Sequence, residues 1–274
     1  MQQHSSSSTV FASIETTVEL QSPIDGSSLA VVRQITSVDR ARPRIHIKLI
    51  FDKLVTQVKG NPWLTYFGCR FAWDNESASV TRSVMGHATG FRSDRFESPD
   101  YVEVSDADHR CVIATHGRPY HRMTGTRMFD SLLIVESEPV REFEFTIDFD
   151  QPFPLRTAVD AMTPPIVTPI PGTLPTSMTS SWILGLSARN VELIHSGVRP
   201  ATDDASEELS LFLTETEGVL TRCLIRTARP VTAAFDVDAD RSRKVALEIT
   251  DQGVVVPLSG FQFKEVLLSL QESR

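Results

Sequence analysis

The clearest pattern in the sequence is an alternation of apolar and polar residues near its middle. Phe143, Phe145, Ile147 and Phe149 alternate with Glu142, Glu144, Thr146 and Asp148. A period of two puts one set on a buried face and the other in water, which predicts a strand of a half-solvated antiparallel sheet. The apolar run at residues 132–135 comes just before it and predicts a partner strand that is buried on both faces.

Similar short runs predict strands on both sides of this stretch. In the first half of the chain they fall at residues 13–20, 29–35, 44–51, 101–104 and 110–115. Turn-forming residues separate them, for example at positions 23–26 and 39–43. No apolar stripe with a 3.6-residue period continues for three turns, so the sequence predicts an all-β fold.

A proline-rich segment divides the chain. Five prolines fall between residues 164 and 175, and because proline lacks a backbone donor, this segment cannot be a central strand. We expect an extended connector at residues 164–180, with a large β-sandwich at 9–163 before it and a small C-terminal β-sandwich at 181–274 after it. The serine-rich residues 1–8 are expected to be a disordered lead-in.

Composition narrows the possible partners and location. With 27 Lys and Arg against 35 Asp and Glu, the net charge is −8, so the chain lacks the positive field that nucleic-acid binding needs. No apolar run approaches the roughly 20 residues that cross a membrane, and residues 1–13 do not resemble a signal peptide. Three widely spaced cysteines predict buried, reduced thiols, which favours a cytoplasmic location.

Common catalytic and metal-binding motifs are missing from the sequence. It has no nucleophile elbow, phosphate-binding loop, dinucleotide loop or HExxH helix. His116 and His121, with His87 and His109 nearby, do not have a spacing that defines a zinc site, and hydrogen-bonding histidines at strand ends are the alternative. A calcium-loop pattern that starts at Asp236 fails, because its sixth position is Arg241 instead of glycine.

Several longer strings carry a resemblance to a known family. These are NPWLTYFGCRFAWDNE, FESPDYVEV, PYHRMTGTRMFDSLLIV, VREFEFTI, SWILGLSARNVEL and LSLFLTETEG, which together extend over most of residues 60–270. They resemble the C-terminal β-sandwich region of glycoside hydrolase family 38, the α-mannosidases, and some are similar to its bacterial branch.

The resemblance implies an antiparallel β-supersandwich of the galactose mutarotase-like type, followed by the smaller sandwich. In that family the nucleophile, the acid/base and the zinc ligands belong to an N-terminal α/β barrel, which has no counterpart in this sequence. The resemblance therefore implies no catalytic residue, metal ligand or cofactor in this chain, with zinc only in the absent catalytic domain. It also implies a catalytic barrel of the same polypeptide or complex as a partner, and it leaves open whether this chain acts as an enzyme.

A carbohydrate-binding rim is the candidate site. Sugars stack on aromatic faces, and planar polar groups bind their hydroxyls. The residues of these types at the entrance to the central strands are Trp73, Tyr120, His121, Arg122, Arg127 and Asp130. Structural roles compete with this interpretation, because Trp63 and Trp73 could pack in the core and Arg122 or Arg127 could pair with Asp130.

The sequence thus supports three hypotheses about function. The first is a non-catalytic β-sandwich region that supports the barrel of an α-mannosidase-like enzyme and contributes to its sugar-binding rim. The second is a stand-alone carbohydrate-binding module. The third is a structural or interaction domain.

Overall fold

The computed structural model describes residues 2–163, 166, 182–200, 207–238 and 244–271. The chain divides into two compact units, residues 1–164 and 165–274. Each unit is built from antiparallel strands, and the described part of the chain contains a single helix. The predicted all-β fold is therefore confirmed, whereas the predicted connector at 164–180 lies outside the described residues except for Ile166.

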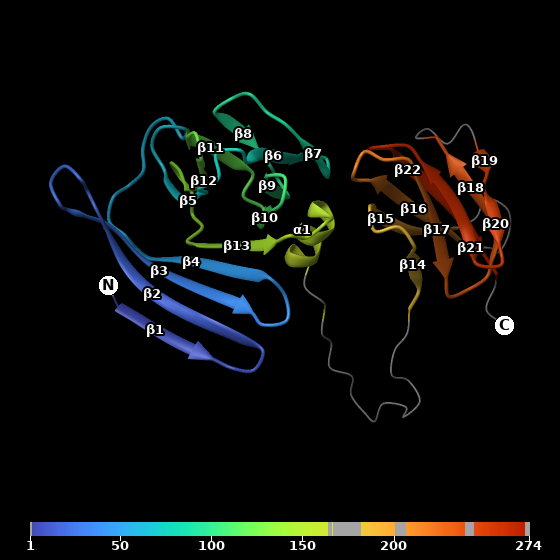
Figure 1. Ribbon diagram of the computed structural model, residues 1–274, viewed down its shortest axis with the longest axis horizontal. Helices are drawn as coiled ribbons and strands as arrows, with labels where there is room; N and C mark the ends of the chain where they lie inside the picture. Colours follow the sequence, from blue (N-terminus) through green and yellow to red (C-terminus); the bar gives the residue numbers. More distant parts are fainter. Residues whose placement is uncertain (1, 164–165, 167–181, 201–206, 239–243, 272–274) are drawn as a thin grey trace. The chain divides into compact units, whose positions relative to one another are not determined.

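The first unit contains a nine-stranded sheet (Figure 1). Its order is β1 (Gln2–Ser7), β2 (Phe11–Gln21), β3 (Ser28–Asp39), β4 (Arg44–Leu54), β13 (Glu142–Phe149), β10 (Arg110–Ala114), β9 (Tyr101–Ser105), β6 (Ser79–Val84) and β7 (His87–Thr89). The first four strands follow one another as hairpins, and β13 joins them to the strands from the middle of the unit.

A four-stranded sheet packs on one face of this large sheet. Its order is β5 (Phe67–Ala72), β12 (Met128–Ile134), β11 (Tyr120–Gly125) and β8 (Arg95–Glu97). The core between the sheets is rich in phenylalanine, and the Phe71 ring lies 5.2 Å from that of Phe129 and 5.1 Å from that of Phe145. Burial of these large rings stabilises the first unit.

Helix α1 (Pro154–Met162) covers part of the opposite face of the large sheet. Leu155 and Ala158 are buried against Tyr101, Val112 and Ala114 of β9 and β10. The sequence analysis missed this helix, because its nine residues are too few for a three-turn apolar stripe. Within the described part of the chain, no helix has the length and apolar character needed to cross a membrane.

The second unit is a sandwich of a four-stranded and a five-stranded sheet. The first has the order β14 (Leu184–Leu186), β17 (Thr221–Thr227), β21 (Gly253–Leu258) and β20 (Glu248–Thr250). The second has the order β15 (Val191–Pro200), β16 (Glu207–Glu215), β22 (Phe263–Leu270), β18 (Val231–Val237) and β19 (Lys244–Ala246). Aliphatic side chains such as Leu211, Leu213, Val256 and Leu268 fill the core between them.

Three sequence expectations need correction. The expected disordered lead-in contains β1, because its backbone pairs with β2 from Gln2 to Ser7 whatever the side chains are. The strands β12 and β13 are not partners, since they belong to different sheets. The expected wet face of β13 is partly dry, because Thr146 and Asp148 are almost fully buried. On the face expected to be buried, Phe149 is 38% exposed.

The cysteines are all free thiols, and Cys223 is fully buried. Burial raises the pKa of Cys69 to about 12 and that of Cys111 to about 11. Because the thiolate is the reactive form, these two side chains are unreactive at neutral pH.

Candidate functional site

The outer face of the four-stranded sheet carries most of the polar residues that the sequence singles out. Side chains alternate along β11, so Tyr120 and Arg122 point outward while His121 points into the core. Directly opposite residues share a face. The register therefore adds Glu97 beside Tyr120, and Arg95 and Asp130 on either side of Arg122.

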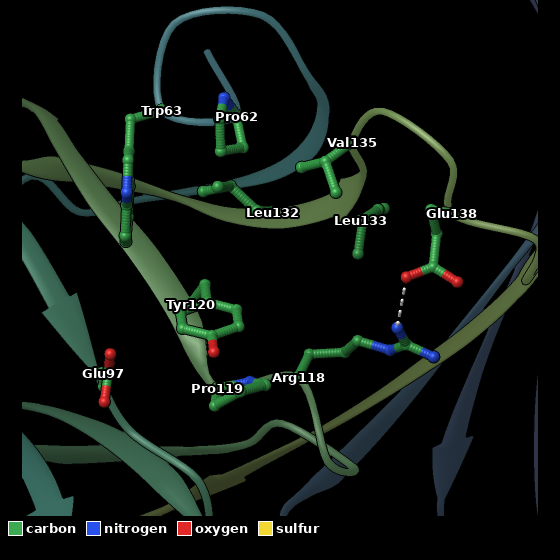
Figure 2. A pocket seen from close by; sticks show the side chains of 10 residues that line it. All are labelled: Pro62, Trp63, Glu97, Arg118, Pro119, Tyr120, Leu132, Leu133, Val135 and Glu138. Carbon is green, nitrogen blue, oxygen red and sulfur yellow. Dashed lines mark ion pairs between the residues drawn. The ribbon is translucent and has the colours of Figure 1, made fainter. Parts of the chain in front are cut away.

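A pocket of about 460 Å³ opens on this face (Figure 2). Its lining comes from the loop after β4, from β8, from the start of β11 and from the end of β12. The residues are Pro62, Trp63, Glu97, Arg118, Pro119, Tyr120, Leu132, Leu133, Val135 and Glu138. This volume lies within the range of about 300–1,000 Å³ that is usual for small-molecule sites.

Two aromatic rings form the wall of the pocket. The Trp63 and Tyr120 rings lie 6.0 Å apart and are nearly perpendicular, at 89°. Trp63 is held in place by its backbone, since Asn61 Oδ1 accepts from its N–H at 2.9 Å and the Arg122 guanidinium donates to its carbonyl at 2.8 Å. The guanidinium of Arg95 lies 5.6 Å from the centre of the Trp63 ring. The Trp63 side of the wall is therefore anchored through its backbone.

Charged groups lie on two sides of these rings, as Figure 2 shows. On one side Arg118 and Glu138 form an ion pair at 3.5 Å, and the Arg118 guanidinium also stacks 4.7 Å from the Phe143 ring centre. On the other side Glu97 is exposed. The pocket thus combines an apolar wall with carboxylate acceptors and guanidinium donors.

His121 does not reach the pocket. It is fully buried, stacked 5.1 Å from the Phe96 ring and edge-on to Phe129, and its Nε2 lies 3.4 Å from the Ser98 carbonyl oxygen. Burial lowers the pKa of His121 to about 4, so the ring is neutral at pH 7. The geometry makes His121 a core residue.

Asp130 and Arg122 have structural partners. Asp130 is 6% exposed and accepts a two-pronged contact from Arg70, at 2.7 and 2.9 Å, and a further bond from the Tyr66 hydroxyl at 3.0 Å. Arg122 and Arg70 both lie opposite Asp130, on β11 and β5 respectively, but both guanidinium bonds to this carboxylate come from Arg70. The predicted pairing of Asp130 with Arg122 or Arg127 is therefore wrong. Arg122 instead holds the Trp63 loop.

Trp73 and Arg127 lie together away from the pocket lining. Trp73 packs beside the core, 6.4 Å from the Phe129 ring, which agrees with the packing alternative. Arg127 donates to the Asp74 carbonyl, and its guanidinium lies 3.7 and 3.6 Å from the Asp74 and Glu76 carboxylates. Of the six residues proposed for the rim, only Tyr120 lines this pocket.

Trp63 is the site residue that the sequence analysis left in the core. The signal that could have identified it is its position in a turn-forming loop beside Pro62, where a large ring has less core to pack against. No group of three or more His, Cys, Asp or Glu side chains among the described residues is arranged to hold a metal ion.

Comparison with known proteins supports the fold class that these sheets define. No family model and no curated protein matches the sequence. The chain is similar in structure to an α-mannosidase from Enterococcus faecalis V583, with a TM-score of 0.70 and 10% identity over 98% of this chain and 35% of the other. A protein of glycosyl hydrolase family 38 from Enterococcus faecalis is also similar, with a TM-score of 0.66 and 11% identity over 98% of this chain and 36% of the other.

The predicted resemblance to part of a family 38 enzyme is thus confirmed at the level of the fold. This chain spans about a third of the length of each of those two proteins. Almost the whole chain, with both of its β-units, takes part in the match.

Proposed function

We propose that this chain is the non-catalytic β-sandwich region of an α-mannosidase-like glycoside hydrolase, and that the pocket beside Trp63 and Tyr120 binds a sugar. The structural match to one third of two such proteins supports the first part. The nearly perpendicular pair of aromatic rings in the pocket wall carries the second part.

The chemistry of the pocket suits a neutral sugar ring. The apolar C–H face of a pyranose packs on an aromatic ring, which removes apolar surface from water on both partners. The sugar hydroxyls then reach the carboxylates of Glu97 and Glu138 and the guanidinium of Arg118, which accept and donate hydrogen bonds respectively.

In this proposal the catalytic groups belong to a partner barrel, either in the same polypeptide or in a complex, and any zinc is bound there. The β-units support that barrel and contribute one wall of its substrate surface. We also infer a cytoplasmic location, for which the three free thiols are the support.

Calorimetric titration with mannose and mannose-containing oligosaccharides tests the pocket. Removing either ring, by Trp63→Ala or Tyr120→Ala, should weaken binding at least about tenfold, since a sugar-stacking ring contributes more than about 1.4 kcal/mol. Trp182→Phe is the control, because this exposed tryptophan lies in the second unit. Equal affinity in all three variants would refute the pocket as the sugar site.

A stand-alone carbohydrate-binding module is the second candidate, because every lining residue of the pocket lies in the first unit. The two candidates differ in what a barrel domain adds. If the chain increases hydrolysis of an α-mannoside when joined to an α-mannosidase barrel, the first holds. If it binds sugar with the same affinity and leaves hydrolysis unchanged, it is a module; if it binds no sugar, a structural or interaction domain remains.

A further inference from the structure

A row of polar side chains, three serines, one histidine and one threonine, crosses the large sheet on the face that also carries α1. The register places Ser6 opposite Ser13, Ser13 opposite Ser37, Ser37 opposite His46, and His46 opposite Thr146. Directly opposite residues point to the same side of a sheet, so these five side chains lie side by side on one face. Figure 1 shows the neighbouring strands that carry them, β1, β2, β3, β4 and β13. With strands about 4.8 Å apart, the row is roughly 19 Å long.

Longer side chains border this row on both sides. On one side, the neighbouring row of the same face consists of Phe11, Asp39, Arg44 and Asp148. On the other side, it consists of Glu15, Ile35, Lys48 and Glu144. Two cavities, of about 450 and 310 Å³, lie along the row and share Ile35, Ser37 and His46 as lining residues. The two cavities thus adjoin and form one trough along the part of the row from Ser13 to Thr146.

One end of the trough holds two imidazole rings in a fixed arrangement. The Thr146 hydroxyl, which is fully buried, lies 3.1 Å from His46 Nδ1 and 2.9 Å from His116 Nε2. Burial lowers the pKa of both histidines, so both rings are neutral at pH 7. Each ring then uses one of its nitrogens for a hydrogen bond with the Thr146 hydroxyl and keeps the other as a donor or an acceptor.

The positive charges of the two border rows, Arg44 and Lys48, are already paired. Lys48 lies 2.8 and 3.5 Å from the Glu142 and Glu144 carboxylates, and Arg44 lies 2.7 and 3.1 Å from those of Asp148 and Asp160. An anionic ligand such as a nucleic acid would find no spare positive charge here. An extended peptide would use the backbone groups of a sheet edge, which a trough across the face does not offer.

We propose that this trough binds a linear, neutral oligosaccharide, at a site separate from the pocket beside Trp63. Its floor presents serine hydroxyls, which donate and accept hydrogen bonds as sugar hydroxyls do, and two neutral imidazoles, each of which keeps one nitrogen as a donor or an acceptor. Ser13 and Ser37 line the larger cavity and are only half-buried, so their hydroxyls can reach a ligand there. Phe11, 46% exposed at the rim, offers an apolar surface to a sugar ring.

Titration of the Trp63→Ala chain tests this site without any contribution from the pocket. The probes are mannopentaose and cellopentaose, followed through the ring signals of His46 and His116 by nuclear magnetic resonance. At least one pentasaccharide should shift both sets of signals, and a pentagalacturonate, which is anionic, should bind at least about tenfold more weakly. If neither neutral probe shifts these signals at millimolar concentration, or if the anionic probe binds best, the proposal is overturned.

A matched pair of variants on β2 locates the site. Ser13→Phe should fill the trough and weaken pentasaccharide binding at least about tenfold. Thr17→Phe lies on the same strand and face but four residues away, opposite Arg33, and should leave binding unchanged. Equal binding by both variants would refute the trough as the site. Chemical-shift mapping on the chain with Ser13 intact provides the same test if Ser13→Phe does not fold.

Discussion

Two buried carboxylates, Asp130 in the first unit and Glu215 in the second, are stabilised in different ways. Among the described residues, Asp130 accepts from two side chains, the guanidinium of Arg70 and the hydroxyl of Tyr66. Glu215, which is fully buried, accepts from four backbone N–H groups, those of Glu217, Gly218, Val219 and Phe261, at 2.8–3.1 Å. The Asn190 side-chain amide adds a fifth bond at 2.8 Å.

The difference shows what each carboxylate does for the fold. Asp130 fixes the Tyr66 loop to the sheet through a cation, so its charge is balanced directly. Glu215 is stabilised by backbone dipoles, and it joins the loop after β16 to the loop before β22, where Gly218 and Phe261 have positive φ values of 74° and 58°. Both carboxylates are fully used in structure, so neither supports a role in binding or chemistry.

The largest expected effect is that of Glu215→Gln. The amide loses the negative charge that all these donors share. Its oxygen can still accept from Gly218, Val219 and Phe261, but its N–H₂ group then faces the Glu217 N–H and the Asn190 amide, which lose their acceptor. We expect the second unit to lose about 4 kcal/mol of unfolding free energy. Urea unfolding followed by hydrogen exchange of β16 and β22 measures this.

The control for that variant is Glu248→Gln. Glu248 forms a largely exposed ion pair with Arg222 at 3.2 Å, so its loss should cost less than about 1 kcal/mol. If the two variants lose similar stability, the backbone donors around Glu215 do not provide the stabilisation that we assign to them.

The two carboxylates are buried as charged groups, whereas His121 is buried as a neutral group. The pH dependence of the stability of the first unit tests this second case. The pKa of His121 is about 4 in the folded chain, against an ordinary value of 6.5 in the unfolded chain. As the pH falls, the unfolded chain therefore takes up a proton on this ring before the folded chain does. The contribution of neutral His121 to the free energy of unfolding is fully present above pH 6.5, and it falls by about 3 kcal/mol as the pH drops toward 4. Unfolding of a Trp182→Phe chain, followed by fluorescence of the first unit, measures this slope.

His121→Phe should flatten that part of the pH profile, because phenylalanine fits between Phe96 and Phe129 and cannot titrate. An unchanged slope in this variant would show that other groups cause the loss of stability in acid.

A smaller effect is expected for Asp130→Asn. The Arg70 side chain is 56% exposed, so water screens the pair, and we expect a loss of about 2 kcal/mol in the first unit. Arg70→Lys keeps the charge but not the two-pronged contact, and it should lose about 1 kcal/mol. A loss from Asp130→Asn as large as that from Glu215→Gln would remove the contrast between the two carboxylates.

The sequence predicts strands better than it predicts their partners. The period of two in β13 is visible in the sequence, because the alternation of side chains between two faces depends only on the strand itself. Which strand lies beside β12 depends on chain closure over many residues, so Arg70 on β5 could not be recognised as the partner of Asp130. The strand β1 was missed for a similar reason, because backbone pairing with β2 gives serine-rich residues a fixed place.

The candidate site was predicted only in part. The same alternation that identified strands separates Tyr120 from His121, since neighbours on a strand face opposite sides. Sequence reasoning grouped them by residue type and by proximity along the chain. Trp63 reaches the pocket through a loop, whose path no periodicity describes.

The most direct test of the account uses the three tryptophan indoles, at positions 63, 73 and 182, which give separate N–H signals in a nuclear magnetic resonance spectrum. An aryl α-mannoside is added to the chain in excess. We predict that the Trp63 signal shifts as the sugar saturates the pocket, that those of Trp73 and Trp182 stay in place, and that the mannoside is recovered intact. A Trp63 signal that does not move, or release of the aryl group by the purified chain, would contradict the account.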